Sequence, residues 1–187
     1  MAKLLPFRQI DENDVINLYA MDSSAATRGL IVKLDATNTW DHANELETTS
    51  INNSYANTVS DRYSVKARVA ACGSGDAPLG MLMYDVAETD ENGEKLIWHP
   101  RKAHEMQVSL SGQAVPVLTR GLVLVELGTT YKDDLDVTVD AGVKAYAGGD
   151  TDGGIFTSST PGTSVQIGKF LGPKNATDNK ALLKLEL

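Results

Sequence analysis

The sequence predicts an all-β fold: a compact β-barrel or β-sandwich with an extended N-terminal arm and at most one or two short helices. Short apolar runs recur along the chain, and clusters of glycine, asparagine and aspartate separate them, as in strands joined by turns. Residues 181–187 place Leu183, Leu185 and Leu187 on one face, which is the two-residue period of a half-buried strand. With only three phenylalanines to fill a core, this pattern favours a barrel or sandwich over a βαβ fold.

Length and composition indicate one folded domain. The chain has 187 residues, of which 42% are apolar and 22% charged, so it can bury a core and does not resemble a disordered protein. We predict an arm over residues 1–27 and a β domain over residues 28–187. A first barrel strand is the equal alternative for the arm. Within the β domain, residues 35–115 are interpreted as an inserted sheet with loops.

The first strand is predicted at Gly29–Leu34, where β-branched residues lie at the centre and the turn formers Asp35 to Asn38 follow. Residues 63–70 alternate with Val65, Ala67 and Val69 inward. Residues 121–127 are apolar on both faces, which is typical of a central strand. Further strands are expected around residues 135–139, 143–145 and 165–167.

Turn chemistry adds three local predictions. Asn92-Gly93 favours a tight hairpin between residues 79–84 and residues 95–98. Pro100 to Glu105 suits one helical turn with proline near its start. Val115-Pro116-Val117 is expected at a sheet edge, because proline cannot donate to an inner ladder.

The charge and the hydropathy pattern argue against several classes of partner. The net charge of −8 and a pI near 4.8 oppose nucleic-acid binding, which needs a basic face. We expect no membrane segment, because no stretch of about eighteen apolar residues occurs. The first residues do not resemble a secretory signal, and the single cysteine, Cys72, excludes an internal disulfide. Synthesis in a reducing cytoplasm is the simplest expectation.

The residues that could support chemistry do not form recognised motifs. His99, His104 and Glu105 lack the spacing of a zinc site, as do Asp41, His42 and Glu45. A calcium loop starting at Asp150 and Asp152 fails, because position six is Ile155 and position twelve is Pro161. Cys72-Gly73-Ser74-Gly75 lacks the nucleophile elbow, and we expect Cys72 to be a buried residue at a strand end. The acid pair Asp133-Asp134 suits a solvated turn. We therefore predict a protein that is not an enzyme, with no catalytic residue, metal or cofactor.

The C-terminal half resembles the capsid decoration, or cement, proteins of tailed bacteriophages. The matching stretches are Asp136 to Tyr146, Gly154 to Thr157, Val165 to Gly172, and Leu182 to Leu187. The step Ile167-Gly168-Lys169-Phe170-Leu171, before a polar turn and a final apolar strand, is the most specific part. Residues 26–34 also resemble the opening strand of phage virion proteins, whereas the middle of the chain matches poorly.

The resemblance implies a β-tulip-like barrel and a structural role on the virion. Such a protein binds the outside of an assembled head and stabilises contacts between neighbouring major capsid subunits. The implied partners are the major capsid protein and further copies of this chain, with a homotrimer expected and a dimer next. We expect the capsid or oligomer interface to use exposed apolar and basic side chains: Leu4, Leu5, Phe7, Trp98, His99 and Arg101.

Three other interpretations remain open. A tail-tube or neck component is also β-rich, and it would polymerise into rings by itself. A carbohydrate-binding β module would present Trp40 or Trp98 as an exposed platform, although each tryptophan is equally plausible as a core residue. A small enzyme would gather Asp41, His42 and Glu45, or the loop acids, in a pocket.

Overall fold

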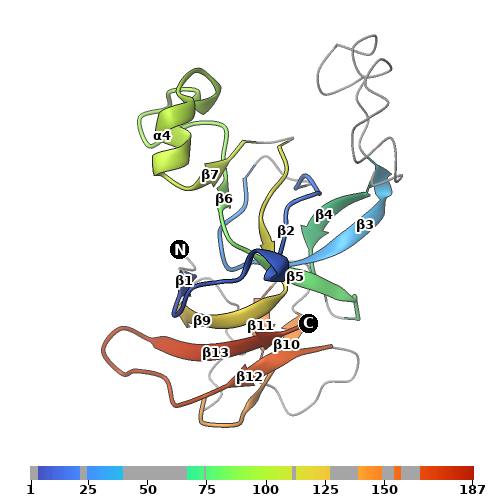
Figure 1. The fold of residues 1–187 in the computed structure, drawn as a ribbon, viewed down its shortest axis with the longest axis vertical. Coiled ribbons are helices and arrows are strands. Elements are labelled where there is room, and N and C mark those ends of the chain that lie inside the picture. Colours follow the sequence, from blue (N-terminus) through green and yellow to red (C-terminus); the bar gives the residue numbers. More distant parts are fainter. Residues whose placement is uncertain are drawn as a thin grey trace.

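The computed structural model describes residues 4–21, 25–39, 67–73, 75–110, 113–126, 139–148, 154–156 and 165–187. These residues form an all-β structure with one short α-helix and a curled, half-barrel sheet, which confirms the predicted fold class. Two antiparallel sheets make up the body. A small unit that contains the helix projects from them (Figure 1).

The six-stranded sheet lies at the lower end of the molecule in Figure 1. Its strands, in spatial order, are β1 (Leu5–Pro6), β9 (Arg120–Glu126), β13 (Lys180–Glu186), β12 (Gln166–Phe170), β10 (Lys144–Gly148) and β11 (Gly154–Phe156). Strand β13 pairs with β9 along its whole length. The predicted alternation is confirmed for Leu183 and Leu185, which are fully buried, whereas Leu187 is 40% exposed because it follows the last paired residue.

A close approach of two strands explains the glycine in the Ile167-Gly168-Lys169-Phe170 step. A Cβ atom built on Gly168 would lie only 2.0 Å from the carbonyl oxygen of Lys184, on the neighbouring strand β13. Ile167 and Phe170, on either side, are fully buried. Residue 168 therefore needs to be glycine for β12 to pair with β13 at this spacing.

The five-stranded sheet lies above the first one in Figure 1. Its strands, in spatial order, are β2 (Val15–Ile16), β8 (Val117–Leu118), β5 (Pro78–Leu82), β3 (Ile31–Thr39) and β4 (Ala67–Ala71). Strand β3 is longer than predicted, because Asp35 continues the ladder by pairing with Arg68 of β4. Tertiary pairing here overrides the turn preference of the residues that follow Leu34.

One hydrophobic core joins the two sheets. Ile31, Met81 and Leu118 of the five-stranded sheet pack in the same cluster as Phe170 and Leu183 of the six-stranded sheet. All of these side chains are fully buried. Because β8 runs almost directly into β9, the chain passes from one sheet to the other at this core. The two sheets therefore form a single packed body.

The N-terminal segment is extended and pairs with both sheets. Strand β1 pairs with β9 at the edge of the six-stranded sheet, the short 3₁₀ helix η1 (Glu12–Asp14) follows, and β2 then pairs with β8. Farther along, Ala20 bridges Ala114 and Met21 bridges Val69. The described part of the segment thus adds an edge strand to each sheet.

Two turn predictions are corrected by the structure. Gly93 adopts a φ of +81° and Thr89 bridges Lys95, so the tight turn exists, but residues 96–98 form a 3₁₀ helix in place of a hairpin strand. Strand β8 lies between β2 and β5, so it is not an edge strand. Pro116 precedes β8, and its carbonyl oxygen accepts from the N–H of Met83 at 3.0 Å. Because proline has no N–H, this antiparallel pair of residues forms one backbone hydrogen bond where two would ordinarily be exchanged.

Candidate interaction site

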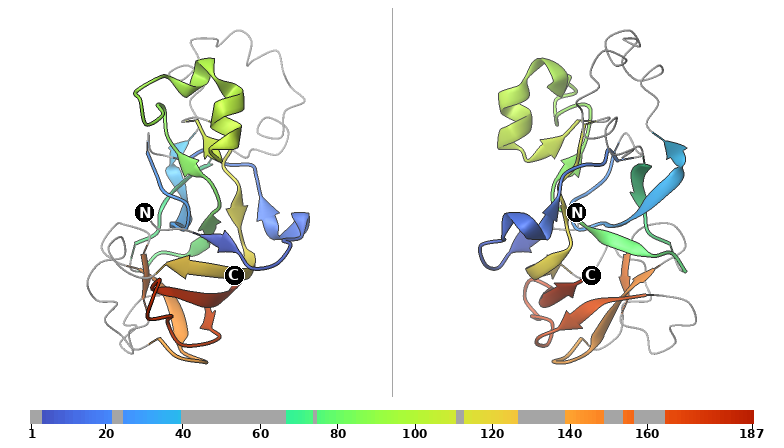
Figure 2. Two further views of the ribbon diagram at one scale, coloured as in Figure 1. Left: turned by 90° about the vertical axis from the view of Figure 1, so that its left-hand side faces the viewer. Right: turned by 45° about the vertical axis from the view of Figure 1, so that its right-hand side comes forward.

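The unit that projects from the body is inserted between two neighbouring strands. It comprises residues 85–110, which we call the knob: β6 (Asp85–Val86), the 3₁₀ helix η2 (Leu96–Trp98), the helix α4 (Pro100–Glu105) and β7 (Val108–Ser109). Strands β5 and β8, before and after it, pair with each other through Leu82 and Val117. The chain therefore leaves and re-enters the body at one point, and the knob stands clear of both sheets (Figures 1 and 2).

Arg28 holds the base of the knob to the body. Its backbone N–H donates to Asp85 Oδ1 at 2.7 Å, and its guanidinium lies 3.1 Å from Asp85 Oδ2. The same guanidinium donates to the side chain of Gln107 at 3.0 Å. Nearby, Ala26 and Val86 exchange two backbone hydrogen bonds. Asp85 and Val86 form β6, and Gln107 directly precedes β7. Because the contacts hold both ends of the knob, they fix the orientation of the knob relative to the body.

A buried carboxylate organises the interior of the knob. Asp90 Oδ1 accepts from the N–H groups of Asn92 (2.9 Å) and Glu94 (2.8 Å), and Oδ2 accepts from the ammonium of Lys102 on α4. The hydrogen bond from Lys102 holds the pKa of Asp90 below its ordinary value of 3.8, and the two backbone donors act in the same direction against the effect of burial. The turn is therefore tied to the helix by charge.

The knob has its own small core and presents two large apolar side chains outward. Leu96, Ala103 and Val108 form the core. Ile97 is 61% exposed and Trp98 is 76% exposed. A shallow groove of about 220 Å³ adjoins Ile97, with Leu110, Glu88 and Lys95 as its other lining residues. We call Ile97 and Trp98 the tip. An exposed tryptophan on a rigid support is the kind of residue that dominates binding energy at protein interfaces.

The predicted interface residues fall into two groups. Trp98 ends η2, His99 lies between η2 and α4, and Arg101 is in α4. Arg101 Nε is 2.9 Å from Glu105, and both side chains are largely exposed. On the N-terminal segment, Leu5 is 41% and Phe7 is 50% exposed.

Leu4 differs from the other predicted interface residues, because it is buried in the main core at 4% exposure. It holds the N-terminal segment in place and leaves no surface for a partner.

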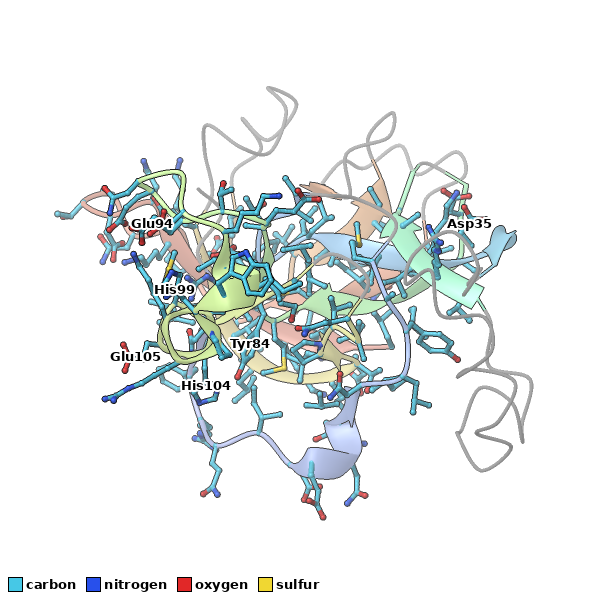
Figure 3. The ribbon with its side chains drawn as sticks, turned by 90° about the horizontal axis from the view of Figure 1, so that it is seen from above. Asp35, Tyr84, Glu94, His99, His104 and Glu105 are labelled. Carbon is cyan, nitrogen blue, oxygen red and sulfur yellow. The ribbon has the colours of Figure 1, made fainter. Side chains whose placement is uncertain are left out.

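The candidate metal groups do not form a site in the described ranges. Figure 3 shows His99, His104 and Glu105 on the knob, and the described residues contain no group of three or more His, Cys, Asp and Glu side chains that could hold a metal ion. Other candidates lie outside the described residues: Trp40, Asp41, His42, Glu45, Asp133, Asp134, Asp150 and Asp152.

Cys72 is confirmed as a buried residue just after a strand. It is fully buried beyond the end of β4, and burial raises the pKa of its thiol to about 11. A thiol in this environment is protonated near neutral pH and is a poor nucleophile.

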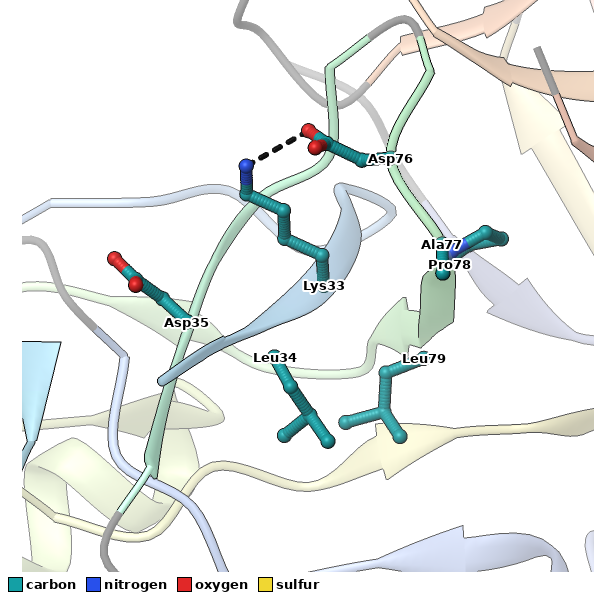
Figure 4. Close-up of a pocket in the computed structure, with 7 residues that line it drawn as sticks. All are labelled: Lys33, Leu34, Asp35, Asp76, Ala77, Pro78 and Leu79. Carbon is teal, nitrogen blue, oxygen red and sulfur yellow. Dashed lines mark hydrogen bonds and ion pairs between the residues drawn. The ribbon is translucent and has the colours of Figure 1, made fainter. Parts of the chain in front are cut away.

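A cleft opens beside β3 (Figure 4). One of its lining residues, Asp35, lies at the other end of the view from His99 of the knob in Figure 3. It has a volume of about 420 Å³, and we call it the β3–β5 cleft after its lining residues: Lys33, Leu34, Asp35, Asp76, Ala77, Pro78 and Leu79. Lys33 Nζ lies 2.8 Å from Asp76 Oδ2, and this hydrogen bond raises the pKa of Lys33 and lowers that of Asp76. Asp76 also accepts from the N–H of Gly73 at 2.8 Å, which fixes the loop before β5.

Sequence reasoning missed the features that build these surfaces. Asp90 precedes Asn92-Gly93 by two residues, which is the spacing of an Asx turn, so its role was detectable. The pairing of Arg28 with Asp85 joins residues 57 positions apart and left no local signal. The β3–β5 cleft combines two strands with the loop before β5, so its lining could not be assembled from spacing.

Comparisons with known proteins gave no match: no protein-family model matches the chain, and neither a curated protein nor a solved structure is similar to it. Among the described residues, no helix is both long and apolar enough to cross a membrane. The function is therefore proposed from the fold and from the exposed side chains of the N-terminal segment and the knob.

Proposed function

We propose that this protein is a structural virion protein that binds the outer surface of an assembled phage capsid and stabilises contacts between neighbouring major capsid subunits. The observation that carries the proposal is the presence of exposed apolar side chains at two separate places on a compact, acidic β body: Leu5 and Phe7, and Ile97 and Trp98. The resemblance of four stretches between residues 136 and 187 to decoration proteins, and of residues 26–34 to phage virion proteins, supports the same role. The protein then acts by adhesion, without a catalytic step, a metal or a cofactor.

We assign the capsid contact to the N-terminal segment. Leu4 points into the core while Leu5 points outward, as alternation along a strand requires. The N–H of Phe7 donates to the carbonyl of Leu122 at 3.1 Å, so the backbone that carries Phe7 is fixed to β9. Two apolar side chains held on an edge strand suit the apolar centre of a protein interface.

The same proposal places many copies on the outside of the capsid, after synthesis in the bacterial cytoplasm. An array of copies raises the effective local concentration of each binding surface, so a modest contact per copy gives firm attachment. We propose a homotrimer as the assembled form, with a dimer as the next choice. The net charge of −8 favours solubility of the free protein and opposes contact with the packaged nucleic acid.

Capsid binding is tested by mixing the purified protein with heads assembled without it, followed by sedimentation and electron cryomicroscopy. We expect added density on the outer surface. The variant Phe7→Ser should bind at least about tenfold more weakly, because an apolar anchor is lost. Leu171→Ser is a matched control, since Leu171 is similarly exposed but lies in the turn between β12 and β13. Heads without added density at micromolar protein would overturn the proposal.

Exposure of Trp98 also favours a second candidate, a carbohydrate-binding β module. An indole face on the surface can stack on a sugar ring. Titration of the protein against a glycan panel, followed by isothermal titration calorimetry, tests this candidate. A saturable change that Trp98→Ala abolishes would support it over capsid binding.

A further inference from the structure

We propose that Asn92 is a modification site at which the side-chain amide is lost and the main chain rearranges to isoaspartate, and that the hydrogen bonds around Asp90 control how fast this happens. The proposal does not depend on the capsid function. It rests on the Asn92-Gly93 step, which occurs once in the sequence, and on the geometry of the turn that contains this step.

The reaction needs two neighbouring groups and water, and asparagine is one of the residues that heat and time degrade. The backbone nitrogen of Gly93 gives its proton to hydroxide and attacks the side-chain carbonyl carbon of Asn92. A carbon–nitrogen bond forms, and the side-chain nitrogen takes a proton from water and leaves as ammonia. Water then opens the resulting succinimide ring at one of its two carbonyl carbons, which gives aspartate or isoaspartate. No oxidant or reductant takes part.

Water and hydroxide can reach both reacting residues. Asn92 and Gly93 are exposed. A Cβ atom built on Gly93 would have nothing within 4 Å of it, so the space around this residue is open. Because glycine has no side chain, it also obstructs the closure of the ring less than any other residue. The step therefore has the access and the composition that the reaction requires.

The closed turn holds the attacking nitrogen back. The N–H of Gly93 donates to the carbonyl of Asp90 at 3.1 Å, and the N–H of Asn92 donates to Asp90 Oδ1 at 2.9 Å. The nitrogen of Gly93 has to lose its proton before it attacks, and a hydrogen bond that uses this proton opposes the loss. The turn therefore has to open before the ring can close.

Opening of the turn depends on Asp90, because the hydrogen bonds of the turn meet at this residue. Asp90 Oδ1 also accepts from the N–H of Glu94 at 2.8 Å, and the N–H of Asp90 donates to the carbonyl of Glu94 at 2.9 Å. Lys102 of α4 binds the other oxygen of the carboxylate, which is fully buried. Without that ammonium the buried carboxylate would lose the charge that faces it, so the turn would open more often.

Isoaspartate at residue 92 would disrupt the turn in which it forms. The main chain then runs through the former side chain, so it gains a methylene group between residues 92 and 93. The N–H groups of Gly93 and Glu94 are displaced from the oxygens of Asp90 that accept them. The rearrangement also leaves a new carboxylate near Asp90, and like charges repel. We therefore expect the modified knob to hold Ile97 and Trp98 less firmly.

The rate is measured by incubating the full chain at mildly alkaline pH and following the tryptic peptide of residues 69–95, in which Asn92 is the only asparagine. Mass spectrometry detects the change from an amide to a carboxyl group, and methylation by an isoaspartyl methyltransferase identifies isoaspartate. We expect the native protein to react at least about thirtyfold more slowly than the protein in guanidinium chloride, because the turn must open first. Equal rates, or native protein without isoaspartate after weeks, would overturn the proposal.

Lys102→Gln tests whether the turn controls the rate. This variant should form isoaspartate about tenfold faster than the native wild type, because the buried carboxylate loses its partner. Arg101→Gln is the matched control and should react like the wild type, since Arg101 lies on the same helix but pairs with the exposed Glu105. Circular dichroism checks that both variants fold. A folded Lys102→Gln protein that reacts at the wild-type rate would contradict the assigned control.

The effect of the modification is tested on aged wild-type protein. The isoaspartyl form carries an additional negative charge, so anion exchange chromatography enriches it. Its amide hydrogens in residues 88–105 should exchange about tenfold faster than in fresh protein, with those of β9 and β13 unchanged. Asn92→Asp is the matched control, since it adds a carboxylate without lengthening the main chain, and it should exchange like fresh protein. An isoaspartyl form that also exchanges like fresh protein would contradict the predicted disruption of the turn.

Discussion

Asp90 and Lys102 form an ion pair in which the carboxylate is fully buried and the ammonium is one-third exposed. The pair joins the turn before η2 to helix α4, so it lies within the knob. Glu94 lies 3.8 Å from the same ammonium and adds a weaker attraction. The stability of the knob therefore depends on this carboxylate more than on any exposed charge around it.

Replacing Asp90 by asparagine should loosen the knob and leave the body intact. The amide keeps one acceptor for the N–H groups of Asn92 and Glu94 but loses the charge that binds Lys102. We expect amide hydrogen exchange in residues 88–105 to accelerate about tenfold or more, with β9 and β13 unchanged. Glu91→Gln is the control and should leave exchange as it is. Equal acceleration in β13 would contradict a local role.

The knob should also open in acid. The pKa of Asp90 is lowered in the folded protein, so its contribution to stability is complete above its ordinary value of 3.8 and is lost as the pH falls through the lowered value. The pKa of Lys102 is raised above 10.5, so its contribution is complete below 10.5 and is lost above the raised value. Between these limits the pair is intact.

The amide resonances of Asn92 and Glu94 report this transition in an NMR titration between about pH 7 and pH 2. We expect them to shift in acid in the wild type and to stay nearly constant in Asp90→Asn. A transition centred above pH 5 would be inconsistent with the lowered pKa.

Gly168→Ala should destabilise the six-stranded sheet strongly. Its Cβ would meet the Lys184 carbonyl at 2.0 Å, so β12 and β13 must separate. We expect a loss of about 2 kcal/mol or more in the free energy of unfolding, measured with urea. Gly172→Ala is the matched control, because a Cβ atom at residue 172 would have nothing within 4 Å of it. Similar losses in both variants would show that the close approach is not the cause.

Cys72 should react with alkylating reagents only after unfolding. With a pKa of about 11, roughly one thiol in a thousand is ionised at pH 8, and burial blocks access to it. Native protein should therefore label far more slowly than protein in urea. Labelling at the same rate in both conditions would show that the thiol is exposed.

Patterns that are local in sequence predicted the fold well. Alternation located β13, and the proline before a polar run located α4. Prediction failed where distant partners decide the outcome: β3 continues beyond Leu34 because β4 lies beside it, and Leu4 is buried because β9 holds the segment that carries it.

For the candidate interaction site, the exposure of Trp98 was undecided from sequence, because an isolated tryptophan fits a core as well as an interface. In the structure Leu96 is buried in the core of the knob, and Trp98, two residues later, is largely exposed. The β3–β5 cleft had no sequence signal, since its rim combines Lys33 with Asp76, 43 positions later.

The knob is inserted between β5 and β8, where Leu82 and Val117 face each other on neighbouring strands. Joining these strands by a short Asn-Gly linker would keep the core that the two sheets share, but it would remove the buried residues Val86 and Val115 from the second core cluster. Foreign peptides grafted at the same point would likewise have both of their ends anchored by the ladder. A scaffold for such peptides should therefore keep the base of the knob, where Val86 packs with the five-stranded sheet.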